Sequence, residues 1–358
     1  MGPRRPKPCG GIMPNIADVV ADEAFGVTAL TESFMSVDHV PGRAGQLVFS
    51  GAGEGIDVDT ATFETMDESI SLIPTAVRGA PGAQEGRDKR KLRSLPVPHI
   101  PLDDRINAAE VRNVRRMGQQ EAVETIQAKL NQQLSKMSRR HDMTIENLRM
   151  GALLGKVYDA DGDELYDLFS TFGVSAESAV NFALDTAGTN LRGKCQEVTR
   201  AMRTNAKTVI PSTAMIHAFC GDTFFDKMLA HPKFEKAYEG YERAARMLGS
   251  NFAYSAIEFG GIIWENYRGT DGGGTTAAGT GVGVAATEAR FFWTGVPGMY
   301  AEYYAPGDFV DTVGAIGLPR YASVALDPLH GRFIDVHTEQ NPLPVCLRPK
   351  TLMSATAT

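Results

Sequence analysis

Four carboxylates within the run DADGDE are the first candidates for chemistry in this chain: Asp159, Asp161, Asp163 and Glu164. Carboxylate oxygens are the ligands that Ca²⁺ prefers. An EF-hand loop, however, has Gly at its sixth position and Glu at its twelfth, whereas here Gly162 comes fourth and no matching Glu follows. The run is therefore interpreted as the polar turn of a hairpin, KVYDADGDELYDLF, and no metal site is predicted.

His217 and Cys220 are close enough in the sequence to suggest a thiolate pair. A reactive thiolate needs an electropositive neighbourhood, and no basic run or orienting acid lies near this one. The segment is predicted to be helical, with a buried histidine and an inert buried thiol. The chain contains no HExxH motif and no GxSxG turn.

The spacing of Gly281, Gly283 and Ala286 matches GxGxxA, a dinucleotide-binding pattern. That site needs a strand before it and a helix after it, but a run of Gly, Thr and Ala precedes this match. Residues 271–286 are therefore predicted to be a mobile loop. Because no nucleophile, metal site or cofactor site is found, no cofactor is predicted and the protein is not expected to be an enzyme.

The composition of the 358 residues is that of a soluble globular protein, with 43% hydrophobic and 22% charged residues. The length allows one or two globular bodies. No run of 18 apolar residues occurs, so no membrane partner is predicted. The four cysteines form no CxxC, which favours a reducing compartment over a disulfide framework. The start, MGPRRPKPCGG, is basic and is predicted to be a flexible arm.

The charge distribution is uneven along the first third of the chain. Residues 10–77 contain eleven acids and one base, whereas residues 78–116 contain ten bases and five acids. Such a split allows electrostatic steering of partners, although two solvated surfaces also explain it. The acids include Asp57, Asp59, Glu64, Asp67 and Glu68, and the bases include Arg87, Lys89, Arg90, Lys91 and Arg93.

Residues 45–98 are predicted to form an extended two-stranded ribbon. QLVFS and SISLIP are typical of strands, and GIDVDTATFETM alternates with period two. Residues 74–98 are rich in Pro, Gly and charge and indicate a long excursion. A solitary hairpin is barely stable in water, so the ribbon is expected to lie on something else, such as a neighbouring subunit.

A long helix is predicted over residues 104–140, capped by Asp103 or Asp104 and about 55 Å long. Its apolar stripe has spacings of three and four residues, as expected for a helix that lies across a sheet. MTIENLRMGALLG continues as helix, with Thr144 as a possible cap. The stripe consists of Val123, Ile126, Leu130, Leu134 and Met137.

The rest of the chain completes an α+β pattern. Residues 176–205 and 213–248 are predicted to be mainly helical, and FAYSAIEFGGIIWENYRG returns to strand. The end alternates strands with Pro turns, in RFIDVHTEQ, LPVCLRP and TLM. These terminal strands are expected to pair with strands formed much earlier in the chain.

A set of segments, taken in order, resembles one known family: ALTESFMSVDHVPGRAGQLVFSGAGEGIDVDTATFE, SLIPTAVRGAPG, VPHIPLDDRINAAEV, VRRMG, ENLRMGALLGKVYDADGDELYDLFSTFGV, HAFCGDTFFDKMLAHPKFEKAY, EFGGIIWENYRG, FFWTGVPGMYAEYYAPGDFVDTVGAIGLPRYA and QNPLPVCLRPKTLM. The chain is similar to the major capsid protein E family of tailed bacteriophages from about Asp18 to Lys350. Two departures are the basic leader before Met13 and Gln340, where the family pattern has Ser.

The resemblance implies the major capsid fold of tailed phages. It implies an N-terminal arm at 1–44, an extended β-ribbon, the E-loop, at 45–98, a peripheral domain with a long spine helix and sheet at 99–178 and 316–358, and an axial domain at 179–315. The implied function is a subunit that forms hexamers and pentamers and self-assembles into the icosahedral head shell around double-stranded DNA. A bacterial nanocompartment with the same fold is the alternative.

The resemblance also implies partners and a location. Scaffold, portal and decoration proteins are expected, and the shell is expected to assemble in the host cytoplasm and to become part of the virion. Arg4, Arg5 and Lys7 are candidates for non-specific contact with packaged DNA, and a loose solubilising arm explains these residues equally well. The basic ribbon tip is expected to contact the acidic residues of a neighbouring subunit.

Overall fold

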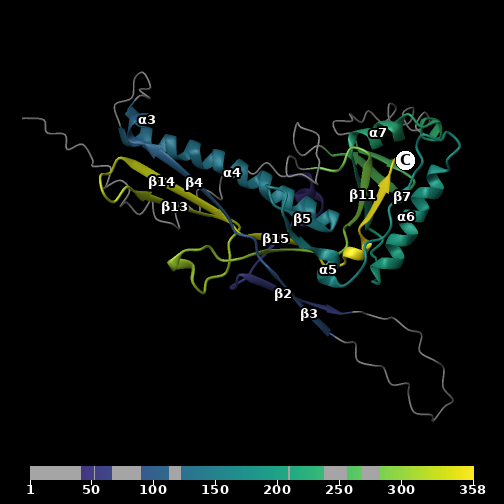
Figure 1. The fold of residues 1–358 in the computed structure, drawn as a ribbon, viewed down its shortest axis with the longest axis horizontal. Helices are drawn as coiled ribbons and strands as arrows, with labels where there is room; N and C mark the ends of the chain where they lie inside the picture. Colours follow the sequence, from purple (N-terminus) through teal and green to yellow (C-terminus); the bar gives the residue numbers. More distant parts are fainter. Residues whose placement is uncertain are drawn as a thin grey trace, which may run out of the picture.

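The chain, in a computed structural model, is an elongated molecule (Figure 1). A narrow arm of three strands and a broader body of strands and helices are joined by one long helix, α4 (Ala122–Leu154). The α+β class is confirmed. The structure describes residues 42–51, 53–66, 90–112, 122–208, 210–237, 256–267 and 283–358.

The broad body is built on a six-stranded mixed sheet in the order β7-β16-β11-β8-β10-β9. Helices α6 (Leu191–Ala206) and α7 (Asp222–Leu229) pack on this sheet and share its apolar core. The strands are β7 Val180–Asn181, β8 Met215–Cys220, β9 Ala256–Phe259, β10 Ile262–Asn266, β11 Glu288–Thr294 and β16 Met353–Thr356.

Trp264 lies at the centre of this core and is fully buried. Its ring lies 5.4 Å from that of Phe291 and 5.6 Å from that of Phe182, both edge to face. Its indole N–H donates to the carbonyl of Phe259 at 3.0 Å, so the polar atom of this side chain is satisfied. Such clusters combine a large buried area with favourable ring geometry and stabilise the sheet.

The narrow arm is an antiparallel sheet with β14 (Phe333–Gln340) between β13 (Tyr321–Leu326) and β4 (Ile100–Asn107). Helix α4 lies over it (Figure 1). Three members of the predicted stripe, Leu130, Leu134 and Met137, are buried and share an apolar cluster with residues of these strands. The expected pairing of a terminal strand with an early one is confirmed, because β14 pairs with β4 along its whole length.

The C-terminal half of α4 packs at the junction of the two parts. A three-stranded sheet lies there, with β12 (Tyr300–Tyr304) between β1 (Gly53–Gly55) and β15 (Pro342–Cys346). The predicted hairpin around DADGDE is confirmed as β5 (Lys156–Tyr158) and β6 (Glu164–Asp167). The short helices are η2 Gly45–Phe49, α3 Ala108–Arg112, α5 Leu168–Phe172, η3 Val310–Thr312 and η4 Pro349–Thr351.

The predicted ribbon is present as an antiparallel pair, β2 (Thr60–Met66) and β3 (Arg90–Pro96). Its base rests on the subunit itself, because Phe63 is buried and its ring stacks on that of Phe172 at 5.4 Å. The predicted SISLIP strand and most of the 74–98 excursion lie outside the described residues, as does most of the 271–286 loop.

The predicted start of the long helix is wrong, whereas its predicted continuation through MTIENLRMGALLG is confirmed by α4, which ends at Leu154. Asp103 and Asp104 do not cap a helix but lie in strand β4, where alternate residues face α4. Thr144 caps nothing either, because α4 continues through it to Leu154 and its hydroxyl donates to the carbonyl of Arg140. The first helix after β4 is therefore α3, which begins at Ala108, and Thr144 lies inside α4.

Three further segments differ from prediction. QLVFS forms the short helix η2 instead of a strand. The segment with His217 and Cys220 is strand β8, not a helix, and lies inside the six-stranded sheet. In the predicted helical stretch 176–205, only the part within α6 is helical.

Candidate assembly surface

The loop between β12 and β13 presents aliphatic side chains to solvent. Val310 is 90% exposed, Val313 84% and Ile316 68%. Soluble proteins rarely leave several aliphatic side chains together in water unless a partner covers them. Residues 305–320 are therefore the candidate assembly surface of the described chain, and are called the apolar loop below.

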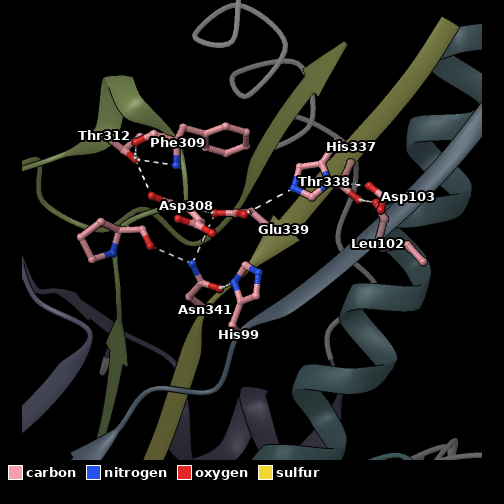
Figure 2. Close-up of polar contacts among 12 residues, drawn as sticks. His99, Leu102, Asp103, Asp308, Phe309, Thr312, His337, Thr338, Glu339 and Asn341 are labelled. Carbon is pink, nitrogen blue, oxygen red and sulfur yellow. Dashed lines mark hydrogen bonds and ion pairs between the residues drawn. The ribbon is translucent and has the colours of Figure 1, made fainter. Parts of the chain in front are cut away.

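Polar contacts fix the start of the apolar loop to strand β14 and the residue that follows it (Figure 2). The side-chain amide of Asn341 donates to the carbonyl of Pro306 at 2.8 Å. The carboxylate of Glu339 accepts the backbone N–H of Asp308 at 2.6 Å. The hydroxyl of Thr312 donates to the carbonyl of Phe309 at 2.9 Å and closes the turn. The loop is thus held in one shape by buried acceptors and donors.

The same carboxylate is tied to the neighbouring strand. Glu339 is 1% exposed, and its second oxygen lies 3.4 Å from Nε2 of His337. Nδ1 of His337 lies 2.5 Å from the carboxylate of Asp103 on β4, its cross-strand neighbour (Figure 2). The network therefore links β4, β14 and the apolar loop.

The far end of the apolar loop is fixed next to the ribbon. The N–H of Gly317 donates to the carbonyl of Ile56 at 2.8 Å, four residues before β2 begins at Thr60. A Cβ at position 317 would lie 2.0 Å from the carbonyl oxygen of Tyr304, so only glycine fits. The exposed aliphatic residues and the base of the ribbon thus form one continuous region.

One buried ion pair and one buried carboxylate on α4 connect the helix with its neighbours. Both oxygens of Glu302 accept bonds from the guanidinium of Arg149 at 2.9 Å. The carboxylate of Glu146 accepts the N–H of Ala44 at 2.8 Å and the hydroxyl of Tyr267 at 2.7 Å. These contacts connect α4 with β12 and with the start of helix η2.

The free energy of unfolding should fall as the pH is lowered from about 6.5 to about 4. Burial, reinforced by Arg320, lowers the pKa of His141 from 6.5 to about 4. In this window the imidazole stays neutral in the folded subunit and is protonated in the unfolded chain, so acid favours unfolding. His141 contributes about 3 kcal/mol to the loss across the window, and His217, whose pKa burial also lowers from 6.5 to about 4, adds to it. Chemical denaturation at both ends of the range measures the loss, and His141→Gln should remove the share of His141 and make the profile less steep. Equal pH dependence in both proteins contradicts this assignment.

No membrane span or metal centre is found in the part of the chain that the structure describes. None of its helices combines the length and the hydropathy that crossing a bilayer requires. No three of its His, Cys, Asp and Glu side chains are arranged to hold a metal ion. The thiol of Cys220 is fully buried, and burial raises its pKa well above the usual value.

Comparison with known proteins decides the family. The family model described as phage major capsid protein E matches residues 26–357. The chain belongs to this family. It is 30% identical to the major capsid protein of Pseudomonas phage KPP10, over 93% of this chain and 97% of that protein. It is 26% identical to the major capsid protein of Salmonella phage Felix O1, over 65% of this chain and 67% of that protein.

The fold is also that of a phage capsid protein. The solved mature capsid of bacteriophage PhiM1 contains a chain that matches this one with a TM-score of 0.51. The match covers 87% of each chain at 13% sequence identity, so it speaks for the fold alone.

The structure describes only some of the contact and DNA-binding residues that the sequence suggested for this capsid-family chain. Asp57 and Asp59 are exposed in the bend before β2. Arg93 is used inside the subunit, because its guanidinium donates to the carbonyls of Thr171 and Phe172. Glu64, Arg90 and Lys91 belong to the paired ribbon strands. Arg4, Arg5, Lys7, Asp67, Glu68, Arg87 and Lys89 lie outside the described residues.

Sequence reasoning missed the apolar loop in this capsid-family chain. The segment GDFVDTVGAIGLP served only as a family motif. Its aliphatic residues have neither the period of a strand nor that of a helix, yet they lie between turn-forming glycines and prolines. Aliphatic side chains in a segment that cannot bury them within an element are the signal that was available.

Proposed function

We propose that this protein is a major capsid protein that self-assembles into the icosahedral head shell enclosing the double-stranded DNA of a tailed bacteriophage. The observation that carries the proposal is the family match over residues 26–357. The named relatives are major capsid proteins of phages, which favours a virus head over a nanocompartment. The role is structural, and the protein is part of the virion.

The proposed parts are the N-terminal arm at 1–44, the E-loop at 45–98, the peripheral domain at 99–178 and 316–358, and the axial domain at 179–315. Supporting this division, the ribbon and the narrow arm project from the six-stranded body (Figure 1). Strand β16, however, pairs with β7 and β11 inside that body. We therefore propose that the last strand belongs with the axial domain.

Assembly is proposed to proceed by contacts between copies of this chain. Hexamers and pentamers close as rings by head-to-tail contacts, because one surface of each copy meets a different surface of the next. The E-loop and the apolar loop link neighbouring copies. Scaffold, portal and decoration proteins are proposed partners, assembly takes place in the host cytoplasm, and Arg4, Arg5 and Lys7 contact packaged DNA.

The direct test is the state of the purified protein. Sizing chromatography and electron micrographs should show rings or closed shells of uniform diameter, with a scaffold protein supplied where needed. A compact monomer at every concentration and salt, even with the scaffold present, would refute the proposed function.

The charge reversal Arg90→Glu with Lys91→Glu should impair shell formation and leave the subunit folded. One exposed pair contributes only about 0–1 kcal/mol, but repetition at every contact makes assembly sensitive to charge and to salt. Shell yield is measured by sedimentation at low and high salt. Asp67→Lys with Glu68→Lys in the same chain should partly restore assembly, with Asp57, Asp59 and Glu64 as the next candidates. Wild-type yield of the first variant at low salt contradicts the idea.

A further inference from the structure

The outward face of α4 carries a stripe of four cations. Lys129, Lys136, Arg139 and Arg140 occur within three turns, and at about 100° per residue they occupy a sector about 100° wide. Lys136, Arg139 and Arg140 are exposed and Lys129 is half-buried. The distance along the axis from the first to the last is about 17 Å. These four residues are called the basic stripe.

The basic stripe is fixed in orientation by the opposite face of the helix. There Leu130, Leu134 and Met137 are buried against the strands of the narrow arm. Figure 1 shows this arm on one side of α4. The four cations therefore lie outside the part of the helix that the apolar cluster covers, with Lys136 and Arg140 at its edge, where they line a cavity with residues of β4.

The net charge of the basic stripe depends on the acids that surround it in the described part of the chain. None of the four cations forms a salt bridge with a carboxylate among the residues that the structure describes. Asp103 and Asp104 lie nearby and line a cavity of about 230 Å³ with Lys136 and Arg140. Asp103 is engaged by His337, and Asp104 accepts the N–H of Arg105. These two carboxylates stay charged, and against four cations they leave an excess of positive charge along the stripe.

The chemistry of this face suits phosphates better than a protein surface. The centre of a protein interface is depleted in Lys and rich in apolar and aromatic side chains. Along the described part of α4, the one exposed large hydrophobic residue is Met143, beyond the C-terminal end of the stripe. Duplex DNA carries about one negative charge per 1.7 Å of its axis, so a row of cations about 17 Å long matches it without reading bases.

We propose that the basic stripe of α4 binds the phosphate backbone of double-stranded DNA without sequence preference. The inference rests on the proposed function, since a head shell brings many copies of this helix to one packaged duplex. It adds a surface that is separate from Arg4, Arg5 and Lys7.

The test measures how DNA affinity depends on salt. A labelled random-sequence duplex is titrated with full-length, unassembled subunit at about 50–200 mM salt, the range over which phosphate contacts change affinity most visibly. Neutralising three cations, in Lys136→Gln with Arg139→Gln and Arg140→Gln, should reduce the slope of log K against log salt by about 2.7, or about 0.9 per lost contact. Asp104→Asn should tighten binding.

Two matched controls make the result specific. Arg192→Gln with Lys233→Gln and Lys236→Gln removes the same charge around another cavity, beside the start of α6, and should leave the slope unchanged. Lys136→Arg with Arg139→Lys and Arg140→Lys keeps the charge and should bind like wild type. An unchanged slope in the neutralised stripe, or an equal drop in the α6 control, overturns the proposal.

Shell assembly of each variant is scored separately by sedimentation. If the variant with the neutralised stripe assembles normally and its slope is unchanged, the DNA surface is rejected and the proposed function is not affected. Failure of the wild-type chain to assemble even with the scaffold protein present, together with a smaller slope in the neutralised stripe, rejects the proposed function and supports the DNA surface. Loss of assembly in the stripe variant with an unchanged slope assigns the stripe to an acidic protein partner and overturns DNA binding.

Discussion

Replacing Glu302 by Gln should lower the free energy of unfolding of the subunit by about 3–5 kcal/mol. Glu302 is 1% exposed and makes a two-bond ion pair with Arg149, whose side chain is also buried. The substitution leaves the guanidinium in a low-dielectric site opposite a neutral amide, one of whose ends is a donor. Removing one partner of a buried pair is costly for this reason, whereas the intact pair itself adds little net stability.

Chemical denaturation of the unassembled subunit measures this effect as a shift of the midpoint at constant slope. The control is the double replacement Arg149→Met with Glu302→Leu, which removes both charges and keeps similar volumes. It should be close to wild type in stability, because no unpaired charge is left behind. If Glu302→Gln unfolds at the wild-type midpoint, the two side chains do not form a buried pair in solution.

Elements with a local signal were predicted well from the sequence. The β5–β6 hairpin was predicted as such, and the residues of β2, β9 and β10 were predicted to form strands. Strand β3, the partner of β2, lies in the segment that was predicted to be an excursion. The central strand β8 was missed because all its residues after Met215 are buried, so the strand lacks the alternation that marks a half-exposed strand. A fully buried strand that is followed directly by a helix, as β8 is by α7, is difficult to distinguish from that helix by the spacing of its apolar residues alone.

Strand β4 shows a different failure. Its burial does alternate, with Ile100, Leu102, Asp104 and Ile106 on the less exposed side. Two adjacent aspartates before a long apolar stripe nevertheless favoured a helix cap. The deciding partner, β14, lies more than 200 residues later, as the 234-residue separation of Asp103 and His337 shows. Pairing at that distance leaves no local trace in the sequence.

The candidate surfaces were predictable to different degrees. The ribbon was found because its length and charge are unusual, although Arg93 proved to be bound within the subunit. The burial of two charged residues on α4 was not predicted. Charges on a helix usually face water, and here Glu146 and Arg149 are buried by partners from η2 and β12. Only the three-dimensional arrangement brings those partners together.

The double substitution Val313→Asp with Ile316→Asp should abolish shell formation while the subunit stays folded. Both side chains are exposed in the free subunit, so stability should change by less than about 0.5 kcal/mol. In a shell, the apolar loop would be covered by a second copy of this chain. Each new carboxylate would then lose its water without gaining a partner, which opposes the contact strongly. Because the contact repeats at every subunit, the yield of sedimenting particles should fall at least about tenfold, as a difference of about 1.4 kcal/mol per contact already suffices.

The matched control exchanges the two side chains, in Val313→Ile with Ile316→Val. It keeps the same number of methyl and methylene groups on the same loop, and it should assemble as wild type does. Circular dichroism and the denaturation midpoint verify that each variant is folded before its particles are counted. The loop is preorganised by Glu339, Asn341 and Gly317, so the substitutions act on the contact and not on the shape of the loop. Normal shells from the aspartate variant would mean that the apolar loop stays in water in the assembled head. The ribbon and the N-terminal arm would then carry the contacts between copies.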